Sequence, residues 1–195
     1  ILVLDSSTLR IAEGTSLTYQ GSTIRLGVHT LALEGGGTLT LNEDASNPLT
    51  LDEVAGSLLF SGDRPSTVSH LRIAAGDAAS APSLQMTGSG KIETLLHDQS
   101  SQIVFDSDQT LTITQGLTVP AEHVMDLSGS KGGAVLVLGD NLTISGTLKL
   151  NTSATIDNGT LALNGGRLEI GEDVSLTSGI THQASSTVQI ASGKT

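Results

Sequence analysis

The sequence predicts an all-β protein, a single-stranded parallel β-helix (β-solenoid) with three short strands and about 20 residues per coil. Three observations predict this fold. Short segments that alternate polar and aliphatic residues recur along the chain, the C-terminal half matches itself at a fixed spacing, and glycine is abundant at 23 residues. Alternation with period two is typical of a half-buried strand, and glycine is suited to the bends between strands.

The regular spacing places equivalent aliphatic residues of successive coils in columns that form the core. Three such columns are predicted: Leu148, Leu168 and Val188; Leu150, Ile170 and Ile190; and Leu136, Ile156 and Leu176. A further set matches at a slightly shorter spacing, with Leu142 and Ile144 followed by Leu161 and Leu163 and then by Ile180 and His182. His182 then either faces inward or lies in a frayed strand.

Glycines recur where the strands are expected to turn, a position that we call a corner. The predicted corner glycines are Gly139, Gly159 and Gly179 in one set and Gly146 and Gly166 in another. A bend often needs a positive φ angle, which glycine reaches freely and asparagine tolerates, and DNG at 157–159 and NGG at 164–166 fit that need. Antiparallel hairpins are the rival interpretation of NG, but they would not hold one register through three copies.

The side chains between the aliphatic residues are expected to face water. Lys149 and Glu169 fall in the same outer column of adjacent coils. An opposite-charge pair across neighbouring strands contributes a few tenths of a kcal/mol.

The first half continues the pattern with looser spacing, so we expect one continuous solenoid over 1–195, regular in 134–195 and decorated with loops in 42–133. Strands are expected at TLRI (8), SLTY (16), TIRL (23), TLAL (30), TLTL (38), LTL (49), SLLF (57), HLRI (70), SLQM (83), KIET (91), QIVF (102) and TLTI (110). Inserted loops are expected at 42–48, 61–69, 74–82, 96–101 and 128–133. Helix should be almost absent, and LDEVAG at 51–56 is the only stretch that allows a single helical turn.

Composition narrows the possible partners. With no Trp, one Tyr and two Phe, the core must be narrow and aliphatic. A formal charge of −11 disfavours nucleic acid and anionic lipid as ligands. No cysteine is present, and no apolar run is long enough for direct membrane insertion. With no initiator Met and no polar cap at either end, we expect a piece of a longer chain or copies stacked end to end.

The sequence contains no motif for a catalytic, cofactor or metal site, and we predict none. The five histidines lack metal spacing and are expected at the surface or in loops, and no GxSxG occurs. Calcium at Asp98, Asp106 and Asp108 is an alternative, although the glycine-rich calcium nonapeptide is absent. Pairs such as Thr38 with Thr40 are typical of ice-binding solenoids, but the array breaks in the regular half.

Three sequons make Asn141, Asn151 and Asn158 possible glycosylation sites in a secreted protein. The same repeat places asparagine at corners and threonine at strand starts for structural reasons, so both interpretations stay open.

The recurring TLALEGGGTLTLN (30–42), NLTISGTLKLN (141–151) and GTLALNGGRLEIG (159–171) resemble the β-helical shafts of bacterial surface proteins, namely autotransporter passenger domains and filamentous-haemagglutinin-like adhesins. The resemblance implies a non-enzymatic, extracellular structural or adhesive rod on the bacterial outer surface. Such a rod spaces or presents binding surfaces to host or neighbouring-cell molecules, or stacks with its own copies into fibres. The alternative is a polysaccharide lyase or hydrolase on a β-helix scaffold.

Overall fold

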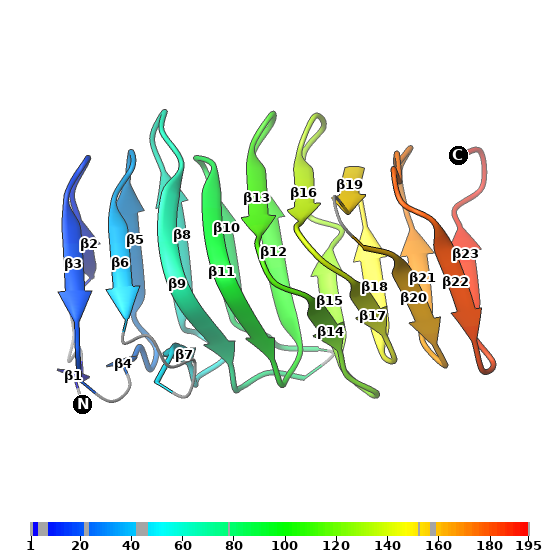
Figure 1. Ribbon diagram of the computed structural model, residues 1–195, viewed down its shortest axis with the longest axis horizontal. Helices are drawn as coiled ribbons and strands as arrows, with labels where there is room; N and C mark the ends of the chain where they lie inside the picture. Colours follow the sequence, from blue (N-terminus) through cyan, green and yellow to red (C-terminus); the bar gives the residue numbers. More distant parts are fainter. Residues whose placement is uncertain are drawn as a thin grey trace.

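The computed structural model describes residues 2–3, 8–21, 24–41, 47–77, 79–151, 153–156 and 159–194. All regular secondary structure in this part of the chain is β-strand, and every recorded strand pairing is parallel. The strands stack turn upon turn into an elongated body with the two termini at opposite ends (Figure 1). The predicted β-solenoid is confirmed, with roughly 23 residues per turn instead of about 20.

Three parallel sheets form the sides of the solenoid. Sheet B has nine strands: β2 (Leu9–Ile11), β5 (Thr30–Glu34), β8 (Ser57–Ser61), β10 (Ser83–Met86), β12 (Ser101–Phe105), β15 (Val124–Leu127), β18 (Thr147–Leu150), β21 (Arg167–Ile170) and β23 (Thr187–Ile190). Sheet C has four: β14 (Leu117–Val119), β17 (Leu142–Ile144), β20 (Leu161–Asn164) and β22 (Ile180–Gln183).

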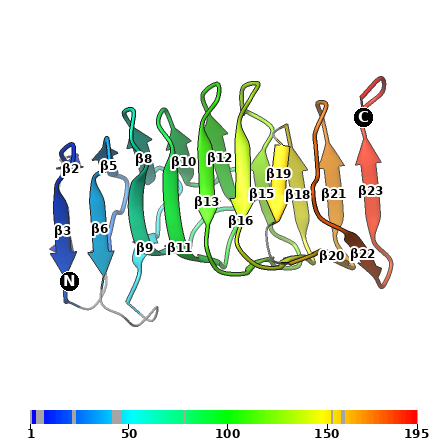
Figure 2. The ribbon, with the colours of Figure 1, turned by 45° about the horizontal axis from the view of Figure 1, so that its top comes forward.

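Sheet A has ten strands and supplies the remaining sides. They are β1 (Leu2–Val3), β3 (Ser16–Tyr19), β4 (Ile24–Arg25), β6 (Thr38–Leu41), β7 (Leu49–Leu51), β9 (Ser66–Ile73), β11 (Gly90–His97), β13 (Thr110–Ile113), β16 (Val135–Leu138) and β19 (Ser153–Ile156). Figure 2 shows β3, β6, β9, β11, β13 and β16 as one layer in front of the sheet B strands.

Two sides of the solenoid merge in the middle of the chain. Strand β9 pairs with β6 through Thr67 and Val68, and with β7 through Leu71, Arg72 and Ile73. Strand β11 repeats this eight-residue span, which Figure 1 shows as a long arrow. The loops expected at 61–69 and 96–101 are therefore shorter than predicted, because 66–73 and 91–97 contain no glycine or asparagine and are rich in residues that favour strands.

No helix forms at 51–56, the one stretch for which the sequence allows a helical turn. The chain leaves β7 and makes a single turn, in which the Gly56 N–H donates to the Glu53 carbonyl at 3.0 Å. A lone bond of this kind closes a corner and does not begin a helix.

The core is a stack of aliphatic rows with few aromatics, as predicted. Leu31, Leu58, Leu84 and Ile103 follow one another along sheet B. Beside them lies a second fully buried row: Leu33, Phe60, Met86 and Phe105. Each residue of a row contacts its copies in the turns before and after, so removing one side chain affects three turns.

The register confirms two of the predicted core columns. Leu148, Leu168 and Val188 are partners in β18, β21 and β23, as are Leu150, Ile170 and Ile190. Val188 and Ile190 are nevertheless 38% and 50% exposed, because β23 is the last strand of sheet B. The register of β17, β20 and β22 also confirms the further set that was predicted at the shorter spacing. His182 pairs with Leu163 in this set but is exposed.

The third predicted column is wrong. Leu136 pairs with Ala154, and Ile156 pairs with Leu138, because the step from β16 to β19 is shorter than the steps of sheet B near the C-terminus. Leu136 is fully buried. Leu176 lies outside the strands of the described chain and packs only partly buried against the core. The spacing that aligns Leu148 with Leu168 therefore does not carry over to this side.

Four of the five predicted corner glycines are required, for a reason that differs from the predicted one. None of the five has a positive φ angle. A Cβ atom on Gly146 would instead lie under 3.0 Å from the carbonyl oxygens of Pro120 and His123 in the preceding turn, and Gly139, Gly159 and Gly166 are similarly close to neighbouring backbone. Gly179 has open space around it. The positive φ expected in NGG belongs to Gly165, at +76°.

Candidate functional site

The candidate site lies on the polar outer face of sheet B. Alternate residues of its strands point away from the core and line up across the turns in what we call the outer row. The outer row consists of Ser83, Gln102, Asp126, Lys149, Glu169 and Gln189. Neighbouring strands of a sheet are about 4.8 Å apart, so this face offers polar groups at a regular repeat along the axis.

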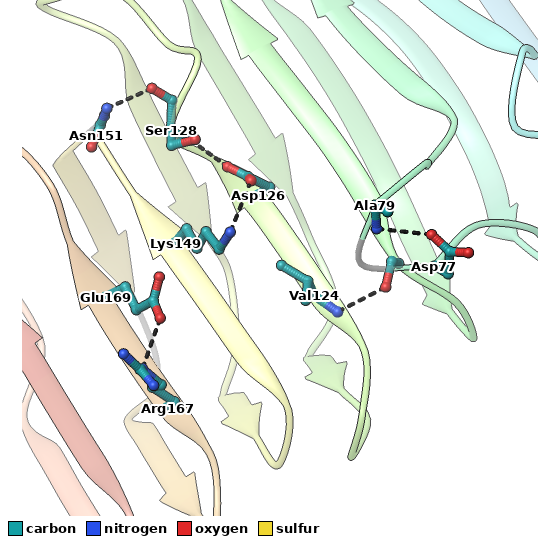
Figure 3. A network of polar contacts seen from close by, with 10 residues as sticks. Asp77, Ala79, Val124, Asp126, Ser128, Lys149, Asn151, Arg167 and Glu169 are labelled. Carbon is teal, nitrogen blue, oxygen red and sulfur yellow. Dashed lines mark hydrogen bonds and ion pairs between the residues drawn. The ribbon is translucent and has the colours of Figure 1, made fainter.

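Ion pairs occupy the C-terminal half of the outer row (Figure 3). Lys149 Nζ lies 3.5 Å from Asp126 Oδ2. Glu169 Oε1 lies 2.7 Å from Nε of Arg167, which also hydrogen-bonds to Gln189. Lys149 and Glu169 are register partners as predicted, but their recorded ion pairs go to other residues. Arg167 is only two positions from Glu169 on the same strand and forms the ion pair with its carboxylate.

Two glutamines lie near the N-terminal end of the outer row, Gln102 within it and Gln85 two residues after Ser83. Gln85 and Gln102 are exposed on the adjacent strands β10 and β12. Gln85 Nε2 donates to Ser83 Oγ over a long 3.4 Å, and the Gln102 amide has no recorded hydrogen bond within the described residues. One amide therefore makes a single long hydrogen bond and the other makes none that is recorded, so both retain capacity for a ligand.

Two shallow hollows meet at Gln102, and we call them together the sheet B groove. The first has a volume of about 110 Å³ and is lined by Asp77, Ala79, Ser80, Ala81, Ser100, Ser101, Gln102, Val124 and Asp126. The second has a volume of about 280 Å³ and is lined by Ser83, Gln85, Met86, Thr87, Gln102, Val104 and Asp106. The groove therefore combines hydroxyl, amide and carboxylate groups with a few aliphatic side chains.

Asp77, Ala79 and Ser80, which follow β9, form one wall of the groove and are joined by hydrogen bonds. The Asp77 carboxylate accepts from the backbone N–H group of Ala79 at 2.8 Å (Figure 3) and from that of Ser80, also at 2.8 Å. These bonds favour the charged form and lower the pKa of Asp77. Nearby, Ser100 Oγ accepts from the Val124 N–H at 3.0 Å and joins two successive turns.

A buried histidine lies behind this wall. His97 is 3% exposed, and its Nε2 atom is 2.8 Å from Ser101 Oγ. Burial, with a smaller contribution from the nearby His123, lowers the pKa of His97 to about 4. The imidazole is therefore neutral at neutral pH.

Two histidines contradict the expectation that all five lie at the surface or in loops. His70 on β9 is 8% exposed and pairs with Thr94, and His97 lies further along the next strand, β11, opposite Ile73. Both lie in the eight-residue strands where two sides merge. The bend in these strands carries polar side chains into positions that elsewhere belong to leucine.

The His97–Ser101 pair lacks the third member of a catalytic triad. Within the described residues no hydrogen-bond partner reaches His97 Nδ1, whereas a catalytic imidazole is oriented by a carboxylate at that atom. Ser101 is also only 1% exposed. The geometry fits a structural bond that fixes the start of β12.

Two of the three aspartates considered as calcium ligands form ion pairs with basic side chains. Asp106 Oδ1 lies 2.5 Å from Lys131 Nζ, and Asp98 Oδ2 lies 2.6 Å from Arg72 Nε. Asp108 is exposed and adopts a positive φ of 61°. Across the described ranges no three His, Cys, Asp or Glu side chains come together as a metal site.

The sequon asparagines differ in their surroundings. Asn141 is exposed, and its side-chain oxygen accepts from the Thr160 N–H at 2.9 Å in the next turn. Asn151 is partly buried and donates its side-chain N–H to the Ser128 carbonyl. Both bonds tie neighbouring turns together, and Asn158 lies outside the described residues.

Comparisons with protein-family models, curated proteins and solved structures give no match. None of the described residues belongs to a helix long and apolar enough to cross a membrane.

Proposed function

We propose that this chain is a non-enzymatic structural module of an extracellular surface, a rod that spaces or presents binding surfaces or stacks into fibres. Its partners are molecules of a host or neighbouring cell surface, or further copies of itself. The bacterial outer surface is the proposed location, in line with the resemblance to adhesin and autotransporter shafts.

The connection of each turn to the next supports this proposal most strongly. Backbone ladders and aliphatic rows run from turn to turn along the axis, and ion pairs reinforce them on the outside. Eight of the nine basic side chains form ion pairs, and seven of these pairs join different turns. One exposed pair contributes at most about 1 kcal/mol, but a series of pairs along the axis resists bending and shear.

The remaining charge favours a surface role over binding to phosphate. Because nearly all basic groups already have an acidic partner, the net charge of −11 comes from acids without one. Such a surface repels nucleic acid and anionic headgroups and opposes nonspecific association.

The C-terminal turn offers an attachment surface for another turn. Ile180, Val188 and Ile190 are 40%, 38% and 50% exposed, although the same columns are buried in preceding turns. Addition of a further parallel turn would cover them, whether it came from the same polypeptide or from a second copy. Head-to-tail contacts that do not close into a ring give filaments.

Electron microscopy of the purified protein tests the proposal. We expect short narrow rods or filaments of the same width, and compact round particles would contradict it. A parallel screen on acidic polysaccharides tests the enzymatic alternative, for which we expect no turnover. Turnover that Asp106→Ala abolishes would replace the structural proposal with the lyase or hydrolase.

A further inference from the structure

We propose that the sheet B groove binds a short neutral oligosaccharide through the side-chain amides of Gln85 and Gln102. This inference rests on the proposed function, since it names the class of ligand that the surface of the rod binds.

The free groups of the groove match the chemistry of sugar hydroxyls. A glutamine amide both donates and accepts hydrogen bonds, as a hydroxyl does, and carries no charge. Gln85 and Gln102 are exposed on neighbouring strands, with Ser83 beside them in the outer row. Val104, the register partner of Gln85, adds an aliphatic surface for the C–H face of a sugar ring.

The charges around the groove favour a neutral ligand. Asp126 and Asp106 are already matched by Lys149 and Lys131, so neither carboxylate is free to hold a cation. Asp77 carries its charge at the other wall and repels an anion. The amides therefore select for hydroxyl groups, and the surrounding acids select against carboxylated or sulfated sugars.

A peptide cannot bind here by adding a strand. Strands β10, β12 and β15 are in the interior of sheet B, and each pairs with a neighbour on both edges. Peptide recognition by strand addition needs a free sheet edge. Side-chain recognition on the outer face is the mode that remains, and the oligosaccharide presents the groups that suit it.

Hydrogen bonds connect the described residues of the groove walls in the absence of a ligand. The Asp77 turn fixes one wall, and the Ser100–Val124 bond holds the first turn of the floor against the next. Behind them the His97–Ser101 bond fixes the start of β12, the strand that carries Gln102 and Val104. Such preorganisation lowers the entropy that a ligand loses on binding.

The test uses an array of neutral, amino and anionic oligosaccharides, followed by calorimetry with the strongest neutral binder. The variant is Gln85→Ala with Gln102→Ala, and the matched control is Gln189→Ala, in the same outer row on β23. We expect binding to a neutral oligosaccharide, about a tenfold or greater loss in the double variant and no change in the control.

Three results would overturn the inference: no neutral oligosaccharide bound, binding of anionic ones alone, or equal affinity in the double variant and the wild type. Circular dichroism of the variants checks that both keep their strands. Failure here with rods seen by microscopy removes only the ligand assignment. Sugar binding by round particles would instead contradict the proposed rod and leave the groove assignment standing.

Discussion

Lys149 Nζ lies 3.5 Å from the Asp126 carboxylate of the preceding turn, while Glu169 of the following turn is its register partner. A single cation thus stands between two acids along the outer row. Because Lys149 is partly exposed, each of these contacts contributes to the free energy of unfolding only as much as an ordinary surface ion pair does.

Reversing this charge would create three acids in succession. We expect Lys149→Glu to lower the free energy of unfolding by about 1 kcal/mol, and Lys149→Met by a few tenths, because like charges directly opposite in a sheet repel. Urea unfolding at about 0.1 M and about 1 M salt measures both effects. A Lys149→Glu penalty that persists in full at high salt would show that the cause is not electrostatic.

Corner glycines differ in how much room they have. Gly146→Ala places a Cβ under 3.0 Å from two carbonyl oxygens, whereas Gly179→Ala meets nothing within 4 Å. We expect Gly146→Ala to cost about 1–3 kcal/mol of unfolding free energy, as in overpacked cores. Gly179→Ala should stay within about 0.5 kcal/mol of wild type. Equal stabilities in thermal and urea unfolding would mean that the turns do not approach this closely.

One column provides a test of core packing. Leu148 is fully buried, while Val188 of the same column is 38% exposed. Leu148→Ala should cost about 2–5 kcal/mol, the range for a cavity in a packed core. Val188→Ala should cost less than about 1 kcal/mol, since solvent already reaches this side chain. Similar losses in urea unfolding would place Val188 inside a covered interface.

Acid should destabilise the fold through His97. Its pKa is lowered from 6.5 to about 4 in the folded chain. Between these two pH values His97 is protonated in the unfolded chain and neutral in the folded chain. Stability contributed by the neutral imidazole is complete above pH 6.5 and falls by about 3 kcal/mol as the pH approaches 4.

Urea unfolding across that pH range measures the effect. His97→Gln should flatten this part of the pH profile, and the exposed His182→Gln should leave it unchanged. An unaltered slope in His97→Gln would assign the acid sensitivity to other groups.

The repeat in the sequence predicts the sheet B columns because the last two steps of that sheet, from β18 to β21 and from β21 to β23, are equal in length. Alternation is enough to locate all twelve strands expected in the first half, since a strand with one buried face requires it. The repeat misaligns Leu136 with Ile156 because the step from β16 to β19 is shorter than the step from β18 to β21.

The candidate site is not visible in the sequence. The step from β10 to β12 pairs Ser83 with Gln102 and Gln85 with Val104, so that the two glutamines lie on adjacent strands. This step is shorter than the step from β8 to β10 before it, so no fixed period predicts the arrangement. Of the buried histidines, His70 escapes notice because HLRI has the pattern of an ordinary alternating strand, and His97 because it falls within the loop expected at 96–101. Only the merging of two sides in β9 and β11 shows that His70 and His97 lie inside.

The central claim is that this solenoid works as an exposed structural rod. Immunogold labelling of intact cells of the organism that makes it, with antibodies against the purified protein, tests that claim most directly. We predict gold on the outer surface of unpermeabilised cells, removed by brief external protease treatment. Gold found only in the cytoplasm of sectioned cells, with intact cells unlabelled, would contradict it.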